Sequence, residues 1–215
     1  MNELNKRTIT SFILIIVLAS MYFNYYIFVL FIIVISLIIL LELNNLFLKF
    51  FKNKFERFLT NFVALIYLFY FSWFSINAFQ TYNFKIFWLY SIAICIVSDI
   101  GGYVFGKFFK GRKLTKISPN KTLSGVIGAF IFSQLLMIIY FFIIDNISFF
   151  ECIIIAFTAS SISQIGDLFI SYLKRKAKVK NTSELLPGHG GLLDRVDGII
   201  FGAPVGFNLF LIFYL

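Results

Sequence analysis

The residues able to do chemistry gather near the C-terminal end of the sequence. Between positions 167 and 198 the chain holds Asp167, Asp194 and Asp197, together with His189, its only histidine. Basic residues lie in the same stretch, namely Lys174, Arg175, Lys176, Lys178, Lys180 and Arg195. Apolar sequence on both sides places this stretch where membrane helices meet water. Carboxylates and cations together at a membrane surface favour a metal ion and a polyphosphate as ligands.

The three aspartates predict a magnesium site. Oxygen ligands suit Mg²⁺, which bridges protein carboxylates to phosphates. Asp194 and Asp197 are three residues apart, so in one helical turn they would face the same side. They would also suit a helix N-terminus simply as dipole partners, but Asp167 on the preceding helix favours the metal. With no suitably spaced cysteines and no second histidine for zinc, we expect Asp167, Asp194 and Asp197 to bind Mg²⁺, with a second cation left open.

A polar stripe leads to this region along an expected helix. At 3.6 residues per turn its members fall within an arc of about 100°. Such a stripe inside a membrane must face protein or a water-filled cavity. A solvated helix end accounts for its lysines, whereas Asp167 lies deeper and favours a function over a structural ion pair. The stripe comprises Ser160, Ser163, Gln164, Asp167, Ser171, Lys174 and Lys178.

Two loops add candidate ligand contacts. Glycines around His189, with Gly190 and Gly191 after it, allow a backbone to approach a ligand closely, although a plain turn is the alternative. Ser118 as N-cap, with proline after it, predicts a helix start that places Lys121 in a first turn favourable to phosphate. In the preceding helix, Asp99 is a second intramembrane acid. The glycines at 102 and 106 beside it favour close helix packing.

The composition predicts how these residues are positioned. Of the 215 residues, 60% are hydrophobic and 13% charged, and the mean hydropathy is +0.91, which excludes an ordinary soluble domain. We expect an all-α, polytopic membrane helix bundle forming one domain over 1–215, with N-terminal spans in 1–84 and the catalytic core in 85–215. The apolar run 8–50 is too long for one span and is divided near Asn24. Seven spans are predicted, at 8–23, 26–46, 58–79, 85–106, 122–144, 148–172 and 198–215.

The charges predict the orientation. With seven spans and a cytoplasmic N-terminus, 18 of the 19 basic residues are cytoplasmic and only Lys85 is external, as the positive-inside rule requires. The formal charge of +9 therefore reflects topology and anionic lipids rather than nucleic acid. The first span resembles a signal peptide core, but no cleavage site follows it, which favours an uncleaved helix. Cys95 and Cys152 lie in apolar spans as small hydrophobes.

These motifs resemble the phosphatidate cytidylyltransferases, also called CDP-diacylglycerol synthases. The resemblance covers about half of the chain, roughly 98–198. It departs from the family pattern at Asn181, Ile170 and Ser124, where acids are usual. The first block comprises Gln164, Gly166, Asp167, Ser171, Lys174, Arg175, Lys180, Pro187, His189, Gly190, Gly191, Asp194, Arg195 and Asp197. The second, weaker block comprises Ser98, Asp99, Gly106, Ser118, Pro119, Lys121 and Thr122.

The resemblance implies that CTP and phosphatidate give CDP-diacylglycerol and pyrophosphate at the cytoplasmic face of a bacterial plasma membrane. CTP, phosphatidate and membrane lipids are then the partners, nucleic acid is not, and a homodimer is left open. Two alternatives remain: a CTP-dependent kinase of polyprenol or another lipid alcohol, and a transporter with an acidic ion pathway. The implied catalytic residues are Asp167, Asp194, Lys174, Arg175, His189 and Arg195. Substrate contacts are expected from Ser171, Lys121, Lys180, Asp99, Gly190 and Gly191.

Overall fold

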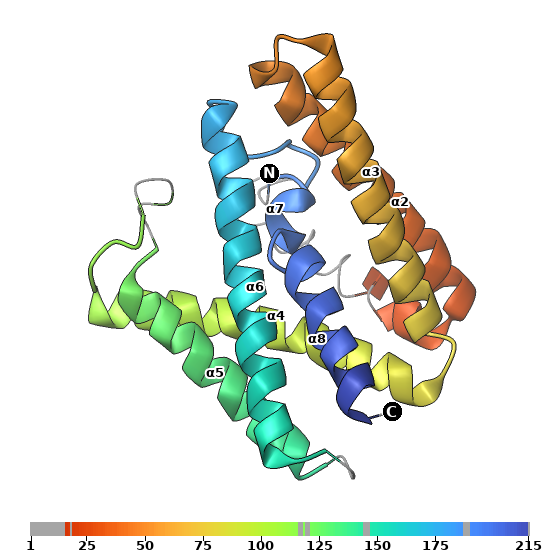
Figure 1. Ribbon diagram of the computed structural model, residues 1–215, viewed down its shortest axis with the longest axis vertical. Helices are drawn as coiled ribbons and strands as arrows, with labels where there is room; N and C mark the ends of the chain where they lie inside the picture. Colours follow the sequence, from red (N-terminus) through yellow and green to blue (C-terminus); the bar gives the residue numbers. More distant parts are fainter. Residues whose placement is uncertain are drawn as a thin grey trace. The chain divides into compact units, whose positions relative to one another are not determined.

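The computed structural model describes residues 16–17, 19–115, 118, 121–143, 147–186 and 190–214. Within these residues the chain is helical, and the only strand-like features are two isolated bridges. Figure 1 shows the helices α2 (Tyr25–Phe50), α3 (Lys54–Ala78), α4 (Tyr82–Phe109), α5 (Leu123–Phe141), α6 (Phe149–Lys176), α7 (Leu193–Val196) and α8 (Ile199–Tyr214). The predicted all-α fold is confirmed.

Six helical segments of the described chain are long and apolar enough to cross a membrane: Tyr25–Phe50, Lys54–Ala78, Phe84–Phe109, Leu123–Phe141, Phe149–Lys176 and Leu193–Tyr214. They correspond to six of the seven predicted spans, and the remaining one, at 8–23, lies mostly outside the described residues. The predicted break near Asn24 is confirmed. Asn24 has an extended backbone, and its side chain caps α2 by accepting hydrogen bonds from the main-chain N–H groups of Tyr26 and Ile27.

The chain divides into two compact units. The first unit comprises Met1–Gln80 and Leu173–Val196, and the second comprises Thr81–Tyr172 and Asp197–Leu215. Each is described by itself below. The predicted single domain over 1–215 stays a prediction.

In the first unit α2 and α3 pair along their length. Ser36 and Ser72 hydroxyls lie 2.7 Å apart, and the Asn61 side chain donates to the Asn44 side-chain oxygen at 2.9 Å. Such hydrogen bonds between apolar helices replace the partners that water would provide, because polar groups in the bilayer need one another.

In the second unit small residues bring α4 against α5. A Cβ added at Gly128 would lie 2.6 Å from the Gly101 carbonyl oxygen, and one added at Gly125 would lie 2.8 Å from that of Gly102. The two backbones therefore meet directly, as the predicted close packing requires. The tight glycine on α4 is Gly101, however, since a Cβ added at Gly102 would make only an ordinary contact at 3.5 Å. The other end of α4 packs on α8, where the Phe87 and Phe210 rings stack with centroids 5.1 Å apart.

Two predicted helix ends are wrong. The N-cap of α5 is Thr122, whose hydroxyl accepts from the Gly125 N–H at 3.1 Å, rather than Ser118. The reason is main-chain pairing: the Leu114 N–H donates to the Lys121 carbonyl, and Thr122 has an extended backbone in a bridge with Lys113. The second wrong end is that of α6, which ends at Lys176. Lys178 has φ +55° and therefore lies beyond the helical stripe that was predicted to include it.

Candidate functional site

In the first unit Asp194 is the centre of a polar cluster. It lies in the single turn α7, and its Oδ1 accepts from Lys174 Nζ at 2.7 Å, with the two side chains only 10% and 12% exposed. Its Oδ2 accepts from the main-chain N–H groups of Thr182 at 2.8 Å and Gly191 at 3.0 Å. The carboxylate thus faces a cation on one side and backbone donors on the other. These charge-assisted bonds fix its orientation.

A tight loop brings these donors to Asp194. Leu186 and Gly190 exchange two main-chain hydrogen bonds, at 2.9 and 3.1 Å. Gly190 has φ +83°, a backbone conformation that residues with a side chain rarely adopt. At Gly191 an added Cβ would lie 1.9 Å from the Thr182 hydroxyl oxygen, so only glycine fits. The sequence predicted that these glycines let the backbone approach a ligand closely. In the structure they let it approach other residues of the protein. His189 lies outside the described residues.

Glu42 of α2 belongs to the same cluster, and sequence reasoning missed it. It is 4% exposed. Its carboxylate accepts four hydrogen bonds, from the Thr182 and Ser183 hydroxyls and from the Leu192 and Leu193 N–H groups. The available signal was that Glu42 is the only acid in the apolar run 8–50. Intramembrane acids are functional candidates for that reason alone.

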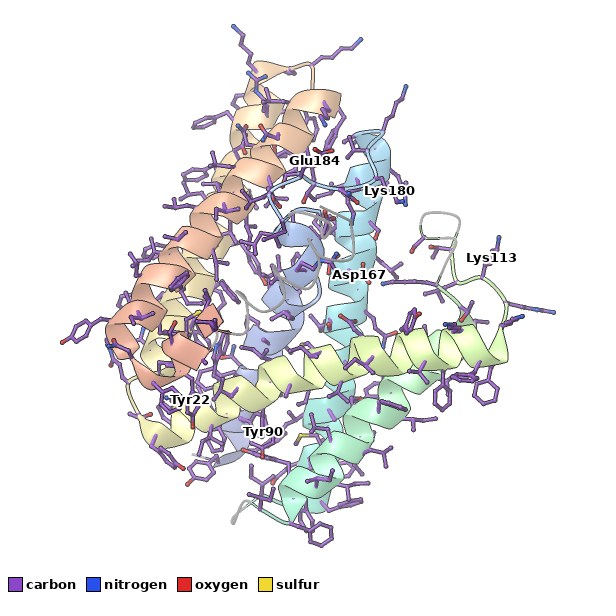
Figure 2. The ribbon with its side chains drawn as sticks, turned by 180° about the vertical axis from the view of Figure 1, so that it is seen from behind. Tyr22, Tyr90, Lys113, Asp167, Lys180 and Glu184 are labelled. Atoms are coloured by element: carbon purple, nitrogen blue, oxygen red, sulfur yellow. The ribbon has the colours of Figure 1, made fainter. Side chains whose placement is uncertain are left out.

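In the second unit the predicted residues Asp167, Lys121, Ser171 and Asp99 come together. Lys121 Nζ forms an ion pair with Asp167 Oδ2, with the two side chains 26% and 23% exposed. The Ser171 hydroxyl donates to Asp167 Oδ1 at 3.3 Å. Asp99 of α4 interacts electrostatically with both Asp167 and Lys121. Asp167 is labelled in Figure 2, where it projects from α6.

The stripe above Asp167 on α6 faces protein, as predicted. Ser160 and Ser163 are fully buried. The Ser160 hydroxyl lies 2.7 Å from that of Ser98, and the Gln164 amide donates to Ser160 at 3.3 Å. The hydroxyl of Ser160 and the amide of Gln164 are therefore hydrogen-bonded within the helix packing. Asp167 is the first ionisable residue along the stripe.

The expectation that Asp194 and Asp197 share one helical turn is wrong. Asp197 and Gly198 form a turn after α7, and the last long helix begins at Ile199. Asp197 Oδ1 accepts from the Gly198 N–H at 3.0 Å, a local bond that competes with helix formation. Gly198 also lies so close to Ser163 that an added Cβ would be 2.5 Å from its hydroxyl oxygen.

The remaining predicted cations lie at the surface. Arg175, Lys180 and Arg195 are exposed, and Lys180 is labelled in Figure 2. Within the described residues no group of three or more histidine, cysteine or acidic side chains is placed to hold a metal ion. Asp194 belongs to the first unit, while Asp167 and Asp197 belong to the second. A shared magnesium site for the three therefore stays a prediction.

The long apolar helices and their half-buried acid–lysine pairs define a multi-pass membrane protein. The sequence model of the Cytidylyltransferase family matches residues 3–213, and the chain belongs to that family.

The curated relatives are bacterial phosphatidate cytidylyltransferases. That of Rickettsia felis is 43% identical over 130 residues, covering 56% of this chain and 57% of the relative. That of Staphylococcus haemolyticus is 39% identical over 126 residues, covering 58% and 48%. That of Helicobacter pylori is 38% identical over 120 residues, covering 55% and 44%. The chain thus spans about half the length of the curated relatives it matches.

Proposed function

We propose that this protein is a phosphatidate cytidylyltransferase, which converts CTP and phosphatidate into CDP-diacylglycerol and pyrophosphate. The observation that carries the proposal is the similarity to enzymes of that name, 43% identity in the Rickettsia felis case. The geometry adds support, because the acids and lysines of the resemblance form two polar clusters, one around Asp194 and one around Asp167.

The reaction needs mainly positioning and charge neutralisation. A phosphate oxygen of phosphatidate forms a bond to the α-phosphorus of CTP, and the bond to the β-phosphate oxygen breaks as pyrophosphate leaves. Lys174 and Lys121 are held beside carboxylates, so their ammonium groups are already oriented. The phosphate groups of either substrate would compete with these carboxylates for the cations. Arg175, Lys180 and Arg195, which are exposed, supply further charge for phosphate oxygens.

We propose Mg²⁺ as the cofactor, held by Asp167, Asp194 and Asp197. The donor chemistry fits in kind, since Mg²⁺ binds carboxylate oxygens and completes its shell with water and substrate phosphates. When bound it would neutralise the negative charge that builds up on the triphosphate. Asp167 is oriented by Ser171 and Asp194 by two main-chain N–H groups, so both carboxylates are held in place by the protein. A second cation and a homodimer stay predictions.

The acceptor is proposed to be phosphatidate rather than a lipid alcohol. A phosphate monoester is already anionic near neutral pH, whereas an alcohol needs a base to remove its proton. The clusters supply cations beside the acids, which suits an anionic acceptor. We place the active face in the cytoplasm of a bacterial cell, at the inner membrane, because soluble CTP and the basic loops belong there.

One labelling experiment tests the reaction and separates it from its rival. Purified protein in detergent receives CTP labelled with ³²P at either the α or the γ position, with phosphatidate or a polyprenol as acceptor. We expect the α-label to enter lipid only with phosphatidate, and the γ-label to leave as pyrophosphate. Transfer of the γ-label to polyprenol would instead identify a lipid-alcohol kinase. No transfer of either label in the presence of Mg²⁺ would contradict both.

A further inference from the structure

We propose that Glu42 is a positioning residue, which acts from α2 to hold Thr182, Ser183, Leu192 and Leu193 so that Asp194 keeps its active orientation. The inference rests on the proposed function, and it assigns a role to an acid outside the segment that carries the family resemblance. Glu42 is not proposed to touch substrate. It acts through the loop.

The four contacts of Glu42 span both ends of this loop. Oε1 accepts from the Ser183 hydroxyl at 2.6 Å and from the Leu192 N–H at 3.0 Å. Oε2 accepts from the Thr182 hydroxyl and the Leu193 N–H, both at 2.8 Å. One carboxylate therefore ties the start of the loop to its end and to the first residue of α7. Each oxygen has one hydroxyl and one main-chain donor.

Thr182 links Glu42 to the candidate active residue. Its hydroxyl oxygen lies 2.8 Å from Glu42 Oε2 and 3.1 Å from Asp194 Oδ2, while its N–H donates to the same Asp194 oxygen. A hydroxyl has one hydrogen, so it donates to one of the two carboxylates at a time. The shorter distance favours Glu42. Any shift of Thr182 therefore moves a donor of Asp194 directly.

The packing leaves no substitute for Glu42. It is 4% exposed, and Thr182 is 6% exposed. A Cβ added at Gly191 would lie 2.8 Å from both Glu42 carboxylate oxygens, so the loop backbone is in direct contact with the acid. Loss of the carboxylate would leave two main-chain N–H groups without an acceptor, that of Leu193 buried and that of Leu192 partly buried, which is costly. The loop is expected to move until those groups find water.

The test replaces Glu42 by glutamine in the full chain, with Glu56→Gln as the matched control. Glutamine has nearly the same shape but only one acceptor oxygen, so either Leu192 or Leu193 would face an NH₂ group. Glu56 is an exposed acid at the start of α3 in the same unit. Both variants are purified in detergent, and their hydrogen exchange and CTP kinetics are compared with those of the unmodified protein.

We expect Glu42→Gln to speed amide exchange in peptides covering 182–193 by about tenfold or more, since a lost hydrogen bond to a charged group has effects of that order. Peptides of α5 should be unchanged. The KM for CTP should rise at least about tenfold, and the KM for phosphatidate should rise by a smaller factor, because Lys174 pairs with Asp194. A variant that merely folds less well would lower the rate and leave the KM for CTP unchanged. Glu56→Gln should match the unmodified protein in every measurement.

Two outcomes would overturn the proposal: unchanged exchange in 182–193, or faster exchange with an unchanged KM for CTP. If Glu42→Gln fails to fold, Ser183→Ala removes one of the four contacts and should shift exchange and KM in the same direction by a smaller factor. Unchanged values in Ser183→Ala would then count against it. If the unmodified protein transfers no label from CTP, the proposed function fails, but the exchange measurement still decides whether Glu42 anchors the loop.

Discussion

At the scale of single residues, the notable feature is that the predicted acids are paired with predicted cations. Asp194 pairs with Lys174, and Asp167 pairs with Lys121. Taking a charge pair out of water costs free energy that the mutual attraction only partly offsets, so such pairs are poor devices for stability. Their presence among apolar helices therefore supports the proposal that they bind a charged ligand.

The substitutions Asp194→Asn and Asp167→Asn are each expected to abolish most of the activity. Asp194→Asn keeps the shape of the side chain but loses the negative charge that holds Lys174 and would bind Mg²⁺. Asp167→Asn, in the second unit, likewise loses the charge that holds Lys121. We expect turnover to fall by at least about 10²-fold while the protein stays folded, measured by label transfer and by size-exclusion elution. Glu184→Gln, an exposed acid of the same loop, serves as the control. Near-normal rates in both aspartate variants would refute the metal assignment.

The histidine is expected to be less important than the cations. An unperturbed imidazole is the only side chain that could serve as a base near neutral pH, and a phosphate acceptor does not need one. His189→Gln should therefore keep measurable activity. Replacing Lys174 and Arg175 together should chiefly weaken the use of phosphatidate, seen as a higher KM for that lipid. Complete loss in His189→Gln would favour an alcohol acceptor.

At the scale of elements, the sequence predicted the helices well and their ends less well. Long apolar runs with a capping residue, such as Asn24 before α2, fix a helix locally. The start of α5 could not be chosen in this way, because Ser118 and Thr122 are both good caps. Main-chain pairing of Leu114 with Lys121 decides between them. The capping preferences of Ser118 and Thr122 do not predict that pairing.

The candidate site was likewise predicted from the sequence only in part. Asp167 and Ser171 were found because a polar residue inside an apolar helix is conspicuous. Lys121 was singled out from a helix start at Ser118, which the structure places at Thr122 instead. The bonds from Glu42 to Leu192 and Leu193 join residues about 150 positions apart, and no local pattern predicts such a distance. Asp197 was misplaced for the opposite reason, since a local bond to Gly198 interrupts a helix that the spacing favoured.

The α4–α5 contact makes a stability prediction at this scale. A methyl group at Gly128 would lie 2.4 Å from the Phe105 Cβ and 2.6 Å from the Gly101 carbonyl. Gly128→Ala should therefore force the helices apart and destabilise the protein by about 1–3 kcal/mol. At Gly102 the nearest atom would be 3.5 Å away, so Gly102→Ala is the matched control. Thermal unfolding in detergent measures both, and equal melting temperatures would show that this contact does not limit stability.

At the scale of the whole molecule, the charge pattern and the helices together predict how the chain crosses the membrane. Six described segments are long and apolar enough to span, and a seventh span is predicted before them at 8–23. With the N-terminus in the cytoplasm, an odd number of spans leaves only Lys85 of the 19 basic residues outside. Removing one span would reverse the side of every later loop and invert this asymmetry.

The orientation can be measured with two single cysteines. Cys95 and Cys152 are free and buried, and their replacement by alanine gives a background in which cysteines are placed at Lys178 or Asn146. Because position 178 follows α6 among basic residues, we expect it to face the cytoplasm, and position 146, between α5 and α6, to face outward. In intact cells an impermeant thiol reagent should then label position 146 but not 178, while a permeant reagent labels both. The reverse pattern would place the Asp194 cluster outside the cell, away from CTP, and would contradict the proposed function as well as the topology.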